Sequence, residues 1–318
     1  FGLAWRRLII DATGSGPRDF IHPEEPALGR PHLIFAYFGH HKCASTWIHR
    51  ILSFLAVEAG WRTAYLHNSS QFKSDLGAHL RENPVHVLSY VNADIDAVHP
   101  LGPVRGFHVI RDPRDLLVSA YFSHLHSHPT AGWPELEEHR RRLQAVSKEE
   151  GLALEMEFSG PVLQHIASWD YDQPGILEVR QEELTASPEE GFLAILRHCR
   201  ALHPGGPGGL SGSLRWVLHR WNRLSYRRSR IPALPLRTLP EGLVQAAVAA
   251  NRFASLSGGR HRGEEDPLSH YRSGVPGDWR KHFTPELVEA FKDRFGPLAV
   301  KLEYETNSGW TVSSQGLP

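Results

Sequence analysis

A short apolar run followed by a polar loop and a long amphipathic pattern sets the strongest constraint on how this chain can fold. Residues 33–38 read LIFAYF, and residues 38–52 read FGHHKCASTWIHRIL. Branched and aromatic residues favour a buried strand, and the residues from Ser45 onward repeat at helical spacing. Such a loop and first helical turn present unpaired backbone N–H groups, to which the helix dipole adds partial positive charge. The segment therefore predicts a strand, an anion-binding loop that carries Lys42, and a helix.

The rest of the chain repeats this alternation of short apolar runs and longer helical patterns. Strands are predicted at residues 33–38, 63–66, 85–90, 106–110 and 176–179. Helices are predicted to begin near Ser45, Asp115, Glu135, Leu152, Pro188, Leu243 and Pro285. Strands that alternate with crossover helices form a parallel sheet. We therefore predict a three-layer α/β fold with a central parallel β-sheet flanked by helices.

The length of 318 residues fits one large α/β domain. The glycine-rich segment HPGGPGGLSGS, residues 203–213, is typical of a linker or a flexible loop. It could mark a domain boundary, but the segment that follows is too short and too basic to form a core of its own. We therefore predict a single domain over residues 1–318.

Composition and charge exclude several classes of protein. The 35 basic and 35 acidic residues give a net charge of zero, so no global field attracts the chain to nucleic acid. Residues 215–230, RWVLHRWNRLSYRRSR, interleave arginine with aromatic residues, a mixture that can bind nucleic acid. At zero net charge we interpret this segment as a solvated helix face, or as a rim that recruits an anionic cofactor. No run of 18 apolar residues occurs, so we expect no membrane span.

The two cysteines indicate the redox environment. Cys43 and Cys199 lie far apart in the sequence and form no disulfide framework. Disulfides are rare in reducing compartments. We therefore expect a cytoplasmic protein, a prediction that leaves any segment before Phe1 open.

The loop around Lys42 differs from the loop that binds nucleotide triphosphates. That loop needs the pattern GxxxxGK[ST], in which the lysine directly precedes the hydroxyl residue. Here the order is KCAST, with the lysine first and no glycine between it and the helix. No obvious Walker-B carboxylate follows. The order therefore argues against a kinase or a GTPase.

Two further segments have the composition of anion-binding sites. Residues 106–129 read GFHVIRDPRDLLVSAYFSHLHSHP, so that Arg111 ends a strand and Ser119 lies two turns into the next helix. Alternatively, Arg114 and Asp115 are surface charges and Arg111 only caps the sheet. Residues 270–286 read HYRSGVPGDWRKHFTPE, a composition that suits a mobile loop closing over an anion. The alternative for that segment is a basic surface turn before a helix capped by Thr284.

Together the three segments resemble the sulfotransferase family that uses 3′-phosphoadenosine 5′-phosphosulfate (PAPS). HHKCASTW is similar to the family's 5′-phosphosulfate loop, which is often PKSGTTW. IRDPRDLLVSAYFSH is similar to its 3′-phosphate motif, with an arginine and, eight residues on, a serine. RSGVPGDWRKHFT is similar to its C-terminal RKGxxGDWKxxFT segment, and EVRQEELTASPEE to its YEDLxxxP stretch. The resemblance spans about residues 33–304 and implies a P-loop NTPase-like sulfotransferase fold.

The resemblance implies a role for each matching residue. Lys42 would contact the bridging oxygen and the 5′-phosphosulfate, Trp47 would stack on adenine, and Arg111 would hold the 3′-phosphate. The full set of cofactor-binding residues that it implies is Lys42, Cys43, Ala44, Ser45, Thr46, Trp47, Arg111, Ser119, Arg272, Ser273 and Gly274. The chain departs from the family at two of the matched positions. Ala44 stands where a glycine is usual, and Gln181 stands where an adenine-contacting tyrosine is common.

Sulfuryl transfer depends on in-line positioning and on stabilising charge at the leaving oxygen. A lysine beside helix N–H groups provides that stabilisation, so we expect no metal in the reaction. The nearest metal candidate is HLHSHP, in which His124 and His128 stand four residues apart on a predicted helix. We interpret these histidines as lining the acceptor cleft or its rim.

The general base is left open by the sequence. Cytosolic members of the family have a catalytic histidine in a KTHLP-like segment, where this chain has VLSYVNADID. Carbohydrate- and tyrosyl-protein-type members use a glutamate after the second strand, where this chain has His67. A histidine needs only a modest pKa adjustment to act near neutrality. The candidates are therefore His67, Asp94 or Asp96 if buried, and His41 beside the lysine.

Three functions follow from these residues. We predict a PAPS-dependent sulfotransferase that acts on a hydroxyl or amine of a small-molecule or carbohydrate acceptor and releases adenosine 3′,5′-bisphosphate (PAP). The prediction includes no nucleic-acid partner, and a homodimer is compatible with it. The alternatives are a P-loop kinase-like phosphotransferase and a catalytically inert nucleotide-binding protein.

Overall fold

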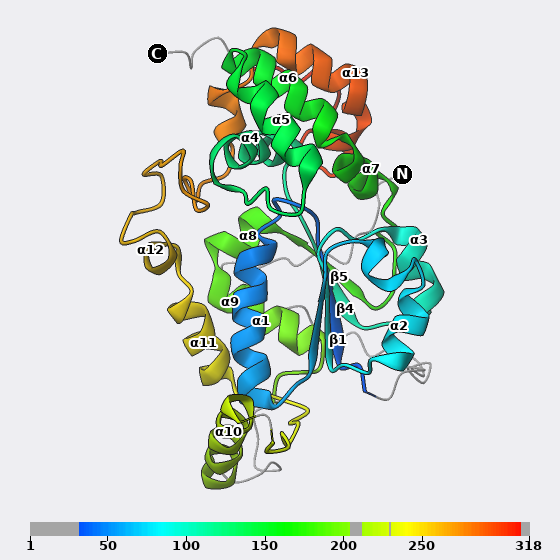
Figure 1. The fold of residues 1–318 in the computed structure, drawn as a ribbon, viewed down its shortest axis with the longest axis vertical. Coiled ribbons are helices and arrows are strands. Elements are labelled where there is room, and N and C mark those ends of the chain that lie inside the picture. Colours follow the sequence, from blue (N-terminus) through cyan, green and yellow to red (C-terminus); the bar gives the residue numbers. More distant parts are fainter. Residues whose placement is uncertain (1–31, 204–211, 229, 313–318) are drawn as a thin grey trace. The chain divides into compact units, whose positions relative to one another are not determined.

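The computed structural model describes residues 32–203, 212–228 and 230–312 (Figure 1). Chain contacts divide these residues into two compact units. The sheet unit comprises residues 1–110 and 169–251, and the helical unit comprises residues 111–168 and 252–318, each as far as described. Most of the predicted glycine-rich linker, residues 204–211, lies outside the described residues. No described helix is both long enough and apolar enough to cross a membrane.

The sheet unit is built on five parallel strands, as the sequence predicts. They are β1 (Phe35–Phe38), β2 (Thr63–Leu66), β3 (Val87–Tyr90), β4 (Gly106–Ile110) and β5 (Ile176–Arg180), in the spatial order β2-β3-β1-β4-β5. β1, β3 and β4 are buried along their whole length, as expected of a parallel sheet covered on both faces. Gly106 opens β4 where a side chain would collide with the Ala36 carbonyl of β1, 2.3 Å from a Cβ.

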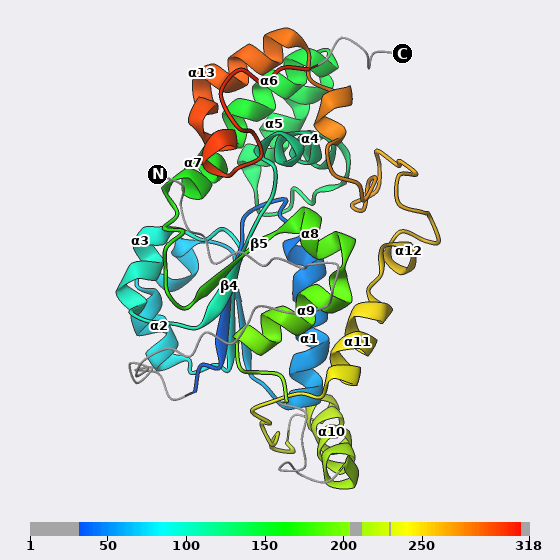
Figure 2. The same ribbon diagram turned by 180° about the vertical axis from the view of Figure 1, so that it is seen from behind.

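Helices cover both faces of this sheet and complete the three-layer α/β fold. Figures 1 and 2 show α1, α8, α9 and α11 on one face and α2 and α3 on the other. The bounds are α1 (Ser45–Ala59), α2 (Leu76–Glu82), α3 (Ile95–Val98), α8 (Gln181–Ala186), α9 (Pro188–His198), α10 (Gly212–Arg227) and α11 (Glu241–Ala250), with short 3-10 turns η1 (Ser69–Phe72) and η2 (His99–Leu101). The main core lies between the first face and the sheet, where residues such as Ile48, Phe107 and Phe192 are inaccessible to solvent.

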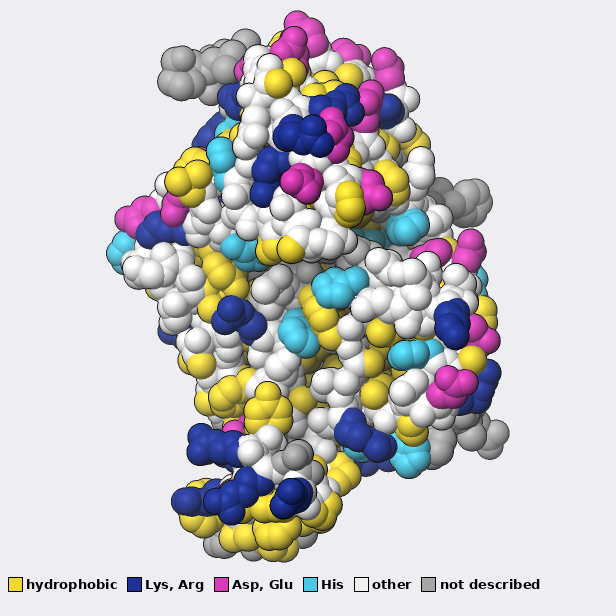
Figure 3. All heavy atoms as spheres, in the orientation of Figure 1, with side chains coloured by type: hydrophobic (Ala, Val, Ile, Leu, Met, Phe, Trp, Pro, Cys, Tyr) yellow, Lys and Arg dark blue, Asp and Glu magenta, His cyan; other side chains and the backbone are white. Residues whose placement is uncertain are grey.

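Helix α10 carries the basic, aromatic segment that the sequence analysis interprets as a solvated helix face. Trp216 is 59% exposed and Tyr226 is 75% exposed. Figure 3 shows arginine and hydrophobic side chains gathered on this helix. Its buried side holds to the rest of the unit through Asn222, whose amide donates to the Glu58 carbonyl at 3.2 Å.

The helical unit consists of helices and contains a π-helical turn, which is a rare element. Its elements are α4 (Pro113–Phe122), the π-helical turn η3 (Ser123–Ser127), α5 (Pro134–Gln144), α6 (Lys148–Phe158), α7 (Gly160–Ser168), α12 (Phe253–Leu256), the 3-10 turn η4 (Asp278–Lys281) and α13 (Pro285–Lys301). The predicted cap of α13 is confirmed, since the Thr284 hydroxyl accepts from the Leu287 N–H at 3.3 Å.

Candidate active site

The Lys42 loop connects β1 to α1 in a backbone conformation suited to an anion. Lys42 (φ 65°) and Ala44 (φ 58°) both adopt the left-handed region, which is uncommon for residues other than glycine. Ala44 is also the N-cap of α1 and has no side-chain oxygen to cap the helix. Left-handed residues at a helix start turn successive N–H groups toward one side, an arrangement that binds anions. The predicted strand, loop and helix are therefore present, with two left-handed residues in the loop.

Backbone contacts fix this loop to the neighbouring strand. The Gly39 N–H donates to the Tyr90 carbonyl at 3.0 Å, and the Gly39 carbonyl accepts from Ala93 at 2.9 Å. The Cys43 N–H is already engaged by the His40 carbonyl at 3.1 Å, and its thiol side chain is buried. The backbone N–H of Cys43, a predicted cofactor-binding residue, is thus used within the turn itself.

A buried hydrogen-bonded chain stands behind the loop, and the sequence analysis missed it. His40 Nε2 lies 2.8 Å from His108 Nε2, and His108 Nδ1 lies 2.7 Å from Glu178 Oε2. The Trp169 indole N–H donates to the other Glu178 oxygen at 3.0 Å. All four side chains are at most 2% exposed. This hydrogen-bonded chain thus runs from the edge strand β5 through β4 to the residue two positions before Lys42.

Burial determines the charges of the side chains in this hydrogen-bonded network. It lowers the pKa of His108 to about 3, so the imidazole is neutral. Burial likewise raises the pKa of Glu178 well above its ordinary value, against the indole N–H of Trp169, which lowers it. A neutral imidazole donates through one nitrogen and accepts through the other. When Glu178 is protonated it donates to His108, which then donates to His40. When Glu178 is ionised it accepts from His108, which then accepts from His40.

The register of the neighbouring strands, had it been known, would have revealed this network from the sequence. His108 and Glu178 are Cα partners across β4 and β5, and Phe38 pairs with His108 across β1 and β4. Each polar residue interrupts an apolar strand, GFHVI in one and ILEVR in the other. Two polar residues in neighbouring buried strands are stable when they bond to each other.

Residues 45–47 begin helix α1 beside the loop. The Ser45 hydroxyl forms a hydrogen bond with the Tyr65 side chain, and Thr46 is exposed. The half-buried Trp47 donates its indole N–H to the Asn251 carbonyl at 2.8 Å and packs edge-on against Phe192. Trp47 is therefore a fixed aromatic platform at the start of α1.

The predicted base candidates follow the carboxyl ends of β2 and β3. In a parallel sheet these ends lie at the same edge as the end of β1, from which the Lys42 loop leaves. His67 is exposed, with its ring 4.8 Å from that of Tyr65. Asp94 is half-buried and caps α3 by accepting from the Asp96 N–H at 3.1 Å, whereas Asp96 is exposed. His41 is half-buried in the loop.

From Arg111 onward the second predicted segment belongs to the helical unit, and its charged residues Arg114 and Asp115 are buried. Arg114 is 1% exposed and pairs with Asp112 at 2.7 Å and with Glu305 at 2.5 Å. Its guanidinium carbon lies 3.9 Å from the centroid of the Trp279 ring and 4.5 Å from that of Trp310. The alternative interpretation, in which Arg114 and Asp115 are surface charges, is therefore wrong.

Asp115 ties the second segment to the third. Its carboxylate accepts the backbone N–H of Gly277 at 2.6 Å and that of Trp279 at 2.9 Å. Burial raises the pKa of Asp115, an effect opposed chiefly by the charge of Arg111. Trp279 is 1% exposed, so the third segment is not a simple surface turn.

Arg272 is held in place by acidic and aromatic neighbours. Its guanidinium donates to Glu265 and to the buried Asp278 and lies over the Phe122 ring at 4.6 Å. Although burial raises the pKa of Asp278, contacts from His282 and Arg272 bring it far below its usual range. Since Phe122 and Ser119 share α4, Arg272 packs against the helix that carries Ser119.

The next two residues continue this arrangement in the helical unit. Ser273 is buried. Gly274 has φ 67°, and a Cβ there would lie 2.8 Å from the Phe253 ring, so glycine is required. The helical unit thus carries Arg111, Ser119, Arg272, Ser273 and Gly274, and the sheet unit carries the Lys42 loop.

Comparisons with known proteins support the fold. No family model matches the sequence, and no curated protein matches it. The chain is similar to the crystal structure of mouse sulfotransferase SULT7A1 complexed with PAP, with a TM-score of 0.50, 12% identity, and coverage of 85% of this chain and 88% of that one. Retinol dehydratase, in complex with androsterone and inactive cofactor PAP, gives a TM-score of 0.40 at 13% identity, with 86% and 82% covered. The first likeness confirms the predicted sulfotransferase fold.

Proposed function

We propose that this chain transfers the sulfuryl group of PAPS to a hydroxyl or amine of an acceptor. The observation that carries the proposal is the Lys42 loop, in which a lysine and left-handed residues stand at the start of a long helix. The sulfotransferase fold supports the same conclusion. The acceptor is a small molecule or a carbohydrate in this proposal, and PAP is the released product.

Lys42 would stabilise the leaving phosphate. Charge develops on the oxygen that bridges sulfur and phosphorus as that bond breaks, and donors fixed beforehand around it lower the barrier. The ammonium of Lys42, the backbone of Ala44 and the hydroxyls of Ser45 and Thr46 are the donors we assign. Cys43 would contribute through shape, since the turn already uses its N–H. Trp47 would stack on the adenine.

The 3′-phosphate would be bound by the helical unit. Arg111, Ser119, Arg272, Ser273 and Gly274 are the residues we assign. Arg272 already contacts two carboxylates, and the charge of Arg111 acts on Asp115. Arg111 and Arg272 would together supply the charge that binds the 3′-phosphate.

We assign His67 as the general base, with Asp94 as the second candidate. The base must take the acceptor's proton at the edge of the sheet where the Lys42 loop lies. His67 follows β2 at that edge and is accessible. Asp94 already accepts a hydrogen bond as the cap of α3, so one of its oxygens is engaged.

The experiment is PAPS-dependent transfer of labelled sulfate to a panel of hydroxyl and amine acceptors, with PAP binding measured in parallel. Lys42→Ala should lower transfer by about 10²–10³-fold while PAP affinity falls less, because one electrostatic donor of the transition state is lost. The exposed Lys73→Ala in the same unit is the matched control. A near-wild-type rate for Lys42→Ala would refute the assigned role. Binding of ATP–Mg²⁺ but not PAP would favour a kinase, and PAP binding without transfer would favour an inert binding protein.

A further inference from the structure

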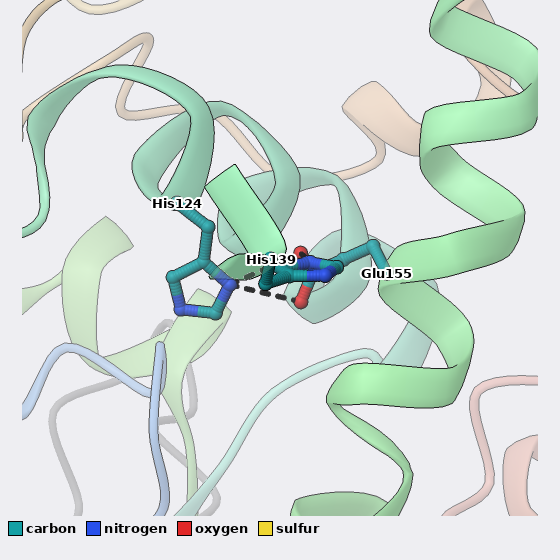
Figure 4. A group of neighbouring side chains, drawn as sticks. All are labelled: His124, His139 and Glu155. Atoms are coloured by element: carbon teal, nitrogen blue, oxygen red, sulfur yellow. Dashed lines mark hydrogen bonds and ion pairs between the residues drawn. The ribbon is translucent and has the colours of Figure 1, made fainter. Parts of the chain in front are cut away.

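Three buried side chains in the helical unit, none of them assigned to the nucleotide, converge on one point. His124 comes from the π-helical turn η3, His139 from α5 and Glu155 from α6 (Figure 4). They are 1%, 3% and 0% exposed. One ligand atom of each lies within 4.8 Å of the other two. The cluster therefore joins three elements through groups that bind transition metals.

The three groups lie close enough together to share one metal ion. His124 Nδ1 lies 3.0 Å from both oxygens of Glu155, and His139 Nε2 lies 2.9 Å from Oε2. Ligand atoms that lie about 2.0–2.2 Å from a tetrahedral zinc ion stand roughly 3.3–3.6 Å apart, so a small outward shift of these side chains would admit the ion.

The surroundings hold the three groups in place. The Ser159 hydroxyl donates to Glu155 Oε1 at 2.5 Å, and the Phe158 ring stacks on His139 at 4.0 Å. Arg140 donates to the carbonyl of His124 at 2.6 Å, which fixes the turn. Contacts to the side chains that bind a metal hold them in the right orientation, and π-helical turns occur often at functional sites.

Glu155 offers its carboxylate oxygens to a cation. Its polar contacts are with two imidazoles and a hydroxyl, those of His124, His139 and Ser159. Among the described residues, no lysine or arginine pairs with Glu155.

The other such cluster, which consists of Glu265, Asp278 and His282, differs in this respect. Arg272 and Lys281 already pair with its Asp278. That cluster is therefore compensated by side chains of the protein.

We propose that His124, His139 and Glu155 form a structural zinc site. Two imidazole nitrogens and two carboxylate oxygens supply four donor atoms of the types that zinc prefers. Since all three side chains are buried, no substrate reaches the ion, and its role is to fasten η3, α5 and α6 together. The histidine-rich turn is thus a folding element in this proposal rather than part of the acceptor cleft.

The test is zinc binding by the purified full chain after EDTA treatment and removal of the chelator. We expect one Zn²⁺ per chain by elemental analysis after dialysis against zinc sulfate. We also expect a melting temperature higher by roughly 5–10 °C at a hundredfold excess of zinc over its Kd. Co²⁺ should give the intense visible absorption of a four-coordinate site.

The variants His139→Gln and Glu155→Gln should lose the bound zinc and the zinc-dependent thermal shift. The matched control is His126→Gln, an exposed histidine in the same turn, which should keep both. Zinc at the same level in His126→Gln and His139→Gln would overturn the proposal, as would wild-type protein that retains no zinc. If a variant does not fold, the wild-type stoichiometry and Co²⁺ spectrum decide. Neither readout needs PAPS, so failure here leaves the proposed transferase activity to its own test.

Discussion

Replacement of Glu178 by glutamine tests the buried chain behind the Lys42 loop. Glu178 lies 2.7 Å from His108 and accepts the Trp169 indole N–H at 3.0 Å. Glutamine keeps the shape and one carbonyl acceptor, and its amide can donate to His108, but it cannot ionise. The substitution therefore changes the proton count of the pair while it preserves the hydrogen bonds.

The proton count predicts how stability depends on pH. The native pair holds one proton over a wide range, because the pKa of His108 falls to about 3 and that of Glu178 rises well above 4.5. Unfolded, the same two groups release their protons near 4.5 and 6.5. Above pH 6.5, and as long as Glu178 keeps its proton, the native pair therefore binds one more proton than the unfolded pair, so stability falls as pH rises. With Glu178→Gln neither state binds a proton there, and this loss disappears.

The magnitude follows from the linkage relation. One extra native proton costs about 1.4 kcal/mol of unfolding free energy per pH unit. Urea unfolding of both proteins at about pH 7.5 and 8.5 should show wild type losing about 1.4 kcal/mol more than Glu178→Gln, since other groups contribute equally to both. An unchanged difference between the two proteins at these pH values would refute the reasoning, because Glu178 would then be ionised in the native state.

Two further predictions concern the helical unit. Arg114→Met should lower unfolding free energy by about 3–5 kcal/mol in urea unfolding, because it leaves two carboxylates without their buried partner. The exposed Arg141→Met should cost less than about 0.5 kcal/mol, and equal losses in the two variants would contradict the assignment of Arg114 to the core. Asp115→Asn should cost about 1–3 kcal/mol and speed amide exchange at Gly277 and Trp279, since one of two accepted N–H bonds is lost. Unchanged exchange there would show that Asp115 does not hold the third segment.

The elements that the sequence predicts well are those with a strong local pattern. The strands at residues 63–66 and 106–110 have the predicted bounds, and the helices at Ser45, Pro188 and Pro285 begin where predicted. Their signals are apolar runs, capping residues and proline at the first turn. The short helices α2, α3, α7 and α8 were not predicted, since four to nine residues carry too little periodicity to distinguish a helix from a loop.

Buried charge was the main feature that the sequence could not reveal. Arg114 stands in RDPRD, a composition typical of a surface turn. Its burial depends on Trp279 and Trp310, more than 160 residues away in the printed sequence, which cover the guanidinium. Helical periodicity describes one element at a time, so it contains no information about what a distant segment places over a charged side chain.

The Lys42 loop likewise combines residues that the local sequence predicts with contacts from distant segments that it does not predict. The residues that would contact the anion are contiguous, so their order alone separates this loop from the kinase pattern. The groups that hold the loop come from three strands and meet only through sheet register, with His40 reaching Glu178 through His108. Because the pKa of His108 is about 3, this imidazole carries no charge. The hydrogen-bonded chain can therefore change the tautomer of His40 but brings no net charge toward Lys42. A substitution at Glu178 that alters transfer without altering PAP binding would therefore act through the orientation of the loop, and not through its charge.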